Sequence, residues 1–290
     1  MKIISFLKSA GAILSPVLIF YAVYEMLFFI FYFYASIYYG NSVADTQFLD
    51  MNIEAFVDRH IFWVFFAALI VFLPIFSYMW KKTRKSILLP TDKSNSLRIG
   101  TTLLVCFFNI LRLFLIASSF MVLGLFYGPA TYESEVGFFD SNSLFMHILA
   151  RVIMVSIVEE LMFRGVVLNR LLVVAPKWLA VLISSILFGL IHTGPLQMIY
   201  ATLGGVFYAL IYIRFRNLLL CIIAHMVFNL AGGSLTVLVF LFSMATRFPV
   251  LSITLPIIAM LGIGALLVLK CPPATFEEKQ LDDVTPKPIS

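Results

Sequence analysis

The chain has 290 residues, of which 62% are hydrophobic and only 12% carry a charge. An ordinary globular domain has about twice that share of charged residues, and a water-soluble fold could not cover so much apolar surface. The composition therefore excludes a soluble protein and predicts a membrane protein. Much of the net charge of +5 lies in one basic run at residues 81–98. This run is typical of a topology signal between two spans, so no nucleic-acid partner is expected.

The apolar segments predict an all-α fold, a polytopic membrane bundle of about eight transmembrane helices. Each segment approaches or exceeds the ~20 residues that a helix needs to cross a hydrocarbon core. The predicted spans are residues 11–39, 61–80, 99–128, 143–168, 178–194, 195–214, 217–245 and 249–270. The fifth and sixth meet at the sequence HTGP. The first has the basic start of a signal peptide, but its apolar part is too long and no cleavage site follows, so we expect an uncleaved span.

The segments between the predicted spans alternate in charge. Every second one is rich in lysine or arginine, as is the start of the chain, and the others are acidic or nearly neutral. By the positive-inside rule this alternation predicts a multi-pass protein of the cell membrane with both termini in the cytoplasm. The polar, proline-rich end predicts a disordered cytoplasmic tail. The expected regions are 1–142, with the N-terminal spans, 143–245, with the chemistry-bearing motifs, 246–270, with the last helix, and the tail 271–290.

The fourth span contains the sequence VEELMFRG, which holds three ionisable residues. A charged group at the centre of a membrane helix costs about 2.5–3.5 kcal/mol and usually faces a protein interior or a wet cavity. Glu160 and Arg164 are four residues apart, share a helix face and can neutralise each other. Glu159 lies about 100° around the helix and is expected to face elsewhere. The alternative is that both carboxylates only join helices.

Two later spans carry further polar side chains at intramembrane depth. His192 follows Phe188 by four residues, and Asn229 follows His225 by four. Each alone is consistent with hydrogen bonding between helices. Counted at about 1.5 Å per residue, these groups and Glu159 fall in one broad layer nearer the cytoplasmic side. An acid, two imidazoles and an amide that converged there could hydrolyse a peptide bond. The Glu and the two His could also bind zinc.

The motifs EExxxR at Glu159, FxxxH at Phe188 and HxxxN at His225, in this order, resemble the CAAX-protease and bacteriocin-processing (CPBP, Abi) family of intramembrane endopeptidases. The resemblance covers about 143–245. It implies cleavage of a peptide bond near the cytoplasmic face of the membrane. The substrate would be a lipidated CAAX-type protein or another membrane protein or peptide, and some bacterial members are linked to bacteriocin immunity.

The same resemblance implies a role for each residue of the motifs. Glu159 would activate water with help from His192, and His225 with Asn229 would form the oxyanion site. The supporting residues would be Glu160, Arg164 and Phe188. No cofactor is expected, because HExxH does not occur, although zinc remains an alternative.

Two other functions stay open. A non-catalytic scaffold or immunity protein would not need these polar side chains, and a proton-coupled transporter would use them as a solute site. Outside the motifs, Glu25 and Arg112 lie in separate early spans and could form an ion pair between helices. The sequence does not specify an oligomeric state.

Overall fold

The computed structural model describes residues 2–40, 46–86, 98–122, 145, 148–192, 194–232 and 243–271, with the side chains at 2–9, 39–40, 46–62 and 85–86 left out. Every regular element within these ranges is a helix, so the predicted all-α fold is confirmed. Residues 272–290 of the predicted tail 271–290 lie outside the described residues, as do the connecting residues 87–97 and 123–144.

Each predicted span contains helical structure. Among the described residues, five helices are long and apolar enough to cross a membrane, namely α1 (Lys2–Gly40), α2 (Thr46–Ser86), α3 (Ile99–Val122), α9 (Pro195–Phe215) and α12 (Pro249–Lys270). Two shorter apolar helices are α8 (Lys177–Leu190) and α10 (Leu218–Gly232). The fourth span consists of the consecutive segments η1 (Ile148–Met154), α6 (Val155–Glu160), η2 (Leu161–Leu168) and α7 (Asn169–Val174).

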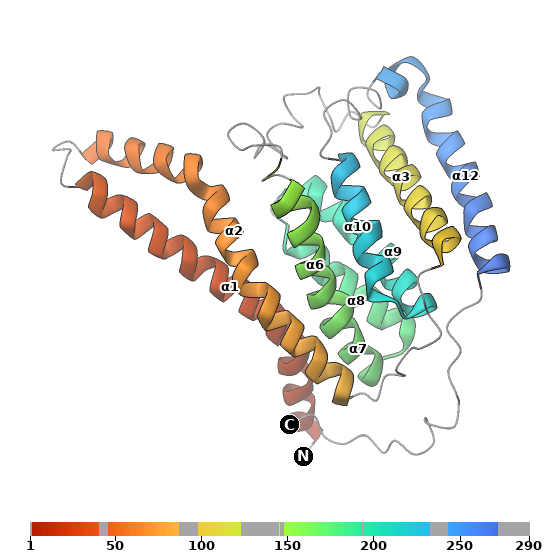
Figure 1. Ribbon diagram of the computed structural model, residues 1–290, viewed down its shortest axis with the longest axis horizontal. Helices are drawn as coiled ribbons and strands as arrows, with labels where there is room; N and C mark the ends of the chain where they lie inside the picture. Colours follow the sequence, from red (N-terminus) through yellow and green to blue (C-terminus); the bar gives the residue numbers. More distant parts are fainter. Residues whose placement is uncertain are drawn as a thin grey trace.

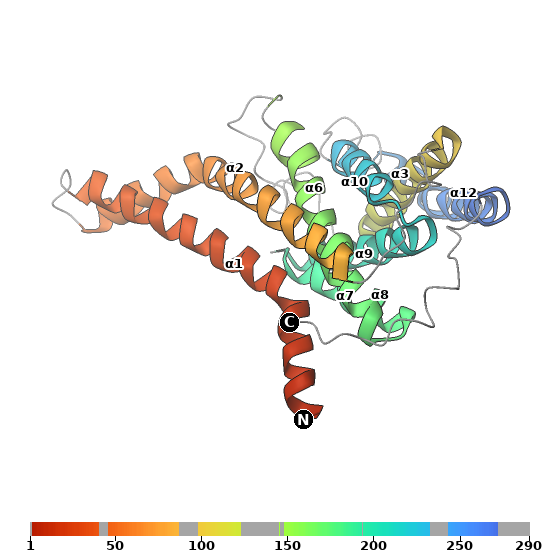
Figure 2. The same ribbon diagram turned by 60° about the horizontal axis from the view of Figure 1, so that its bottom comes forward.

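The helices form three groups side by side. α1 and α2 make a long antiparallel pair on one side, and α3 packs with α12 on the other (Figure 1). The helices of residues 148–232 lie between these two pairs in both views (Figure 2). α2 contacts α6 and η2, whereas α3 contacts α10. The residues of the EExxxR motif therefore lie at the centre of the bundle.

The segment 148–174 is one right-handed helix with two π-helical stretches. The backbone keeps helical dihedral angles at the junctions, for example φ −68° and ψ −37° at Glu160. All residues of η2 are buried, and so are Glu159 and Glu160 just before it. π-Helical turns are rare and frequently occur at functional sites. Both glutamates thus stand where the helix widens.

Glycines bring α8 and α9 into close contact. A Cβ atom at Gly189 would overlap Thr202 Oγ1 and lie 2.7 Å from the carbonyl oxygen of Met198. A Cβ atom at Gly205 would lie 2.9 Å from the Cα atom of Ser185. Small residues let membrane helices approach each other closely. The hairpin they form holds the side chains of both helices against the fourth span.

The expected ion pair between Glu25 and Arg112 is wrong. α1, which carries Glu25, lies on the opposite side of the bundle from α3 (Figure 1). Glu25 is exposed, whereas Arg112 is buried and hydrogen-bonds with Asn109 and Tyr208. Charge alone could pair the two residues in the sequence, but the packing order of the helices separates them.

Candidate active site

Glu160 accepts two charge-assisted hydrogen bonds at the centre of the site. Its Oε1 atom lies 3.0 Å from Arg164 Nη1 and 3.0 Å from His225 Nδ1. Glu160 is fully buried, and Arg164 is 2% exposed. The predicted pairing of Glu160 with Arg164 is therefore confirmed, and it follows from their i, i+4 spacing on one helix. The contact with His225 adds a residue from α10.

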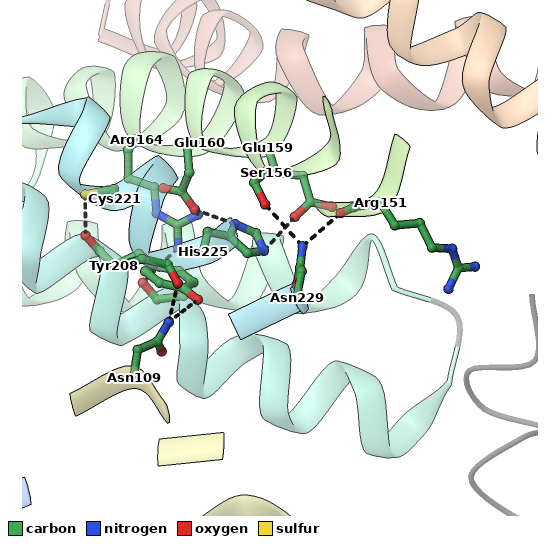
Figure 3. Close-up of polar contacts among 12 residues, drawn as sticks. Asn109, Arg151, Ser156, Glu159, Glu160, Arg164, Tyr208, Cys221, His225 and Asn229 are labelled. Atoms are coloured by element: carbon green, nitrogen blue, oxygen red, sulfur yellow. Dashed lines mark hydrogen bonds and ion pairs between the residues drawn. The ribbon is translucent and has the colours of Figure 1, made fainter. Parts of the chain in front are cut away.

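Glu159 lies at the other nitrogen atom of the same imidazole ring. Its Oε2 atom is 3.7 Å from His225 Nε2, which is too long for a hydrogen bond. Figure 3 shows both glutamates extending from one helix, with the His225 ring between their carboxylates. Glu159 does not share Arg164 with Glu160, as its place about 100° around the helix predicts. It meets the same imidazole from the other side, because an imidazole has two nitrogen atoms.

The Asn229 side chain is held by the helix that carries the glutamates. Its Nδ2 atom donates to the carbonyl oxygen of Arg151 at 3.2 Å and to Ser156 Oγ at 3.2 Å. An amide nitrogen has two hydrogens, so both are engaged in this arrangement. Asn229 therefore lies beside Glu159 and His225, as Figure 3 shows.

His192 lies in the short connection between α8 and α9. Its Nδ1 atom is 2.9 Å from the carbonyl oxygen of Phe188 and can only donate to it. Its Nε2 atom is then the one that can accept a proton or a hydrogen bond. In the described part of the chain, no hydrogen bond joins His192 to Glu159.

The Phe188 ring connects the histidines to Arg164. Its centroid is 5.3 Å from that of His192 and 5.9 Å from that of His225, both in edge-to-face geometry. The Arg164 guanidinium lies 4.6 Å from the Phe188 centroid and also donates to the carbonyl oxygen of Gly205 at 3.1 Å. Aromatic rings can stabilise a buried guanidinium by cation–π attraction. Phe188 thus packs among the groups that the motifs predict to work together.

Some neighbours of the site were not predicted from the sequence. They are Ser156, which accepts from Asn229, and the group of Asn109, Arg112 and Tyr208 beside His225. Arg112 had one available signal, because it is a charged residue within an apolar span. The sequence gives no such signal for Tyr208, since tyrosine is common in membrane helices and Tyr208 and His225 lie on different helices, α9 and α10.

Within the residues that the structure describes, no group of three or more His, Cys, Asp and Glu side chains is arranged to hold a metal ion. Glu160 and His225 Nδ1 are already bonded to each other. The arrangement is therefore that of hydrogen-bonded acid and imidazole groups, which can move protons and stabilise charge.

Residues 141–231, about a third of the chain, match the model of a known protein family. The matching family is described as type II CAAX prenyl endopeptidase Rce1-like. Residues 141–231 are similar to this family and are called the CAAX-protease-like segment below. The match confirms the resemblance that the three motifs indicate. The comparisons with curated proteins and with solved structures give no match.

The CAAX-protease-like segment runs from before η1 to the last turn of α10 and contains all seven residues of the three motifs. It does not contain α1, α2, α3 or α12. Of the helices outside the segment, α2 packs on the glutamate-bearing helix and α3 packs on α10. The flanking helices α2 and α3 can therefore contribute to the site only through these contacts.

Proposed function

We propose that this protein is an intramembrane endopeptidase that hydrolyses a peptide bond near the cytoplasmic side of the membrane. The observation that carries the proposal is the His225 imidazole held between the buried carboxylates of Glu159 and Glu160, within a CAAX-protease-like segment. The substrate would be a lipidated CAAX-type protein or another membrane protein or peptide. The bilayer is its other partner.

Glu159 is the proposed general base. It is 8% exposed and makes no hydrogen bond within the described residues, so one of its carboxylate oxygens is available to a water molecule. Glu159 would take a proton from this water as the oxygen attacks the peptide carbonyl carbon, and later pass the proton to the leaving nitrogen. His192 would assist by accepting a hydrogen bond from the same water at Nε2.

His225 and Asn229 are the proposed donors to the oxyanion that forms on the carbonyl oxygen. Since Nδ1 of His225 faces Glu160, a donor at Nε2 requires a proton on both nitrogens, with the resulting positive charge facing the Glu160 carboxylate. Asn229 would donate once the substrate oxygen replaces one of its two present acceptors. A single such donor contributes about 2.7–4 kcal/mol to the transition state of known acyl-transfer enzymes.

Glu160, Arg164 and Phe188 are the proposed supporting residues. Glu160 keeps Nδ1 of His225 oriented, and Arg164 balances the charge of Glu160. Phe188 packs against both histidines and the guanidinium. The reaction as proposed uses no cofactor. We also propose a location in the cell membrane with both termini in the cytoplasm, on the basis of the basic connections.

The test is a comparison of new protein termini in membranes of cells that produce wild type, Glu159→Gln or Glu25→Gln at equal levels. Glu25 is an exposed glutamate within the apolar helix α1, so its variant is a matched control. We expect new chain ends with wild type and Glu25→Gln and none with Glu159→Gln, because general-base catalysis is worth about 10²–10⁴-fold.

Identical profiles for all three proteins would contradict the proposal and favour the scaffold or immunity function. A solute flux that depends on Glu159 without proteolysis would favour the transporter. Purified protein assayed with and without a zinc chelator, on a peptide drawn from the new termini, tests the zinc alternative. We expect the chelator to leave the cleavage rate unchanged.

A further inference from the structure

Tyr208 of α9 joins the His225 ring to helix α3. The two rings are stacked, with centroids 4.9 Å apart and an interplanar angle of 21°. Tyr208 is 1% exposed, so its hydroxyl must find partners inside the protein. It accepts hydrogen bonds from Asn109 Nδ2 at 3.1 Å and from Arg112 Nη2 at 3.2 Å. Two donors from α3 therefore hold the position of the ring that packs on His225.

Asn109 also bonds the backbone next to His225. Its Nδ2 atom donates to the carbonyl oxygen of Ala224 as well as to the Tyr208 hydroxyl. Arg112 Nε donates in turn to Asn109 Oδ1 at 2.8 Å, which orients the amide so that its nitrogen faces these acceptors. α3 thus holds both the ring stacked on His225 and the peptide that precedes it.

Arg112 is a costly residue for a purely structural contact. It is 6% exposed in a membrane helix, and its Nη1 atom is buried with no hydrogen-bond partner. Its charge lies over the Phe228 ring at 4.3 Å and the Tyr208 ring at 5.4 Å. An apolar residue would join α3 to α9 without the cost of burying a charge. Arg112 instead donates hydrogen bonds to Asn109 and Tyr208. Asn109 bonds the backbone next to His225, and Tyr208 stacks on the His225 ring.

We propose that Asn109, Arg112 and Tyr208 are positioning residues that hold the His225 ring with Nδ1 at Glu160 and Nε2 at Glu159. Two of the three lie on α3, outside the CAAX-protease-like segment, so this helix completes the site. The inference rests on the proposed function as far as catalysis is concerned. The geometric part, a fixed His225 ring, can be measured without any substrate.

The central experiment compares Tyr208→Phe with Tyr212→Phe. Tyr212 is a matched control, because it lies one turn further along α9, is 4% exposed and accepts a hydrogen bond from Asn169 at 2.8 Å. Each variant loses one buried hydroxyl, but only Tyr208 stacks on His225. Arg112→Lys is the second test variant. It keeps the charge, yet an ammonium lacks the planar fork that bonds Asn109 and Tyr208 together.

The first readout is the imidazole spectrum of nitrogen-15-labelled protein in detergent micelles, with the His225 signals assigned by their loss in His225→Gln. We expect these signals to move or broaden in Tyr208→Phe and Arg112→Lys and to match wild type in Tyr212→Phe. Unchanged His225 signals in Tyr208→Phe would overturn the proposal, and so would equal changes in Tyr212→Phe. Because no cleavage is involved, this result is independent of the proposed function.

The second readout is the cleavage of a peptide taken from the new chain ends. We expect kcat to fall about 10–100-fold in Tyr208→Phe and Arg112→Lys, with KM within about twofold, because a small misplacement of a catalytic group can cost this much. Tyr212→Phe should cleave as wild type. Altered His225 signals with an unchanged kcat would overturn the catalytic part. Absence of cleavage by wild type itself would count against the proposed function and not against the ring geometry.

Discussion

α1 and α9 are both helices that can cross a membrane by sequence, with mean hydropathies of 2.0 and 1.6 over their most apolar windows. Their surroundings differ, because 17% of the residues in that window are buried in α1 and 44% in α9. α1 exposes large aromatic side chains such as Phe29 and Phe33, whereas α9 packs through Gly204, Gly205 and Tyr208. Hydropathy thus indicates insertion into a bilayer but not which helix forms the protein interior.

The central helices and the outer α1–α2 pair also differ in the polar contacts that hold them in the bundle. The central helices share the buried network around Glu160 and His225. The α1–α2 pair packs on α6 and η2 and is also hydrogen-bonded to the central helices. Arg170 of α7 donates to Ala12 and Ser15 in α1 and to Thr83 in α2, and Tyr21 of α1 donates to the carbonyl oxygen of Leu190. Removal of a central group should therefore cost more stability than a change in the outer pair.

The largest effect is expected for Arg164→Met. The change leaves the Glu160 carboxylate buried without its cation, and breaking a buried pair in this way costs about 3–5 kcal/mol. The free energy of unfolding, measured by denaturant titration in mixed micelles with circular dichroism, should fall by this amount. The double variant Arg164→Met/Glu160→Gln should recover part of the loss. A double variant less stable than the single one would contradict the pairing.

Gly205→Ala should have a smaller effect on the same quantity. The added Cβ atom would meet the backbone of Ser185 at 2.9 Å, and overpacking of this kind costs about 1–3 kcal/mol. Gly262→Ala in α12 is the matched control, because no atom lies within 4 Å of its new methyl group. Equal stability of the two variants would show that α8 and α9 are not in the close contact described.

Arg170→Met tests the attachment of the outer pair. It removes the hydrogen bonds to α1 and α2, each a charged-to-neutral contact at a partly exposed site, so a loss of about 1–2 kcal/mol is expected. The distribution of distances between spin labels on α1 and α8 should broaden. The distribution between labels on two helices of the site should stay unchanged. Lys177→Met, at an exposed lysine of α8, serves as the control. Unchanged label distances in Arg170→Met would argue against this attachment.

The smallest effect is expected for Phe33→Leu in α1. This side chain is 58% exposed, so its replacement should change the free energy of unfolding by no more than about 0.5 kcal/mol. The melting temperature in detergent is the measurement. Phe163→Leu in η2 makes the same chemical change at a buried ring that packs edge-to-face on Phe188. Phe163→Leu should lower the melting temperature by clearly more than Phe33→Leu. Equal shifts for both would remove the distinction between the two regions.

The sequence by itself determined the membrane class, the helical spans and the Glu160–Arg164 pair. These features depend on local properties, namely apolar length and the spacing of residues within one helix. The three motifs were also sufficient to indicate the family resemblance that the match over residues 141–231 confirms, since the motifs depend on residue identity and spacing along the chain. The roles of Glu159, His192, His225 and Asn229 stay predictions until cleavage is measured.

Only the tertiary structure decided how the groups meet. The convergence of both glutamates on His225, the engagement of Asn229 by Ser156 and the contribution of Asn109 and Arg112 from α3 all join segments far apart in the chain. These contacts depend on the rotation and packing order of the helices. Apolar side chains around each helix leave that rotation undefined in the sequence, and close packing of neighbouring helices sets it.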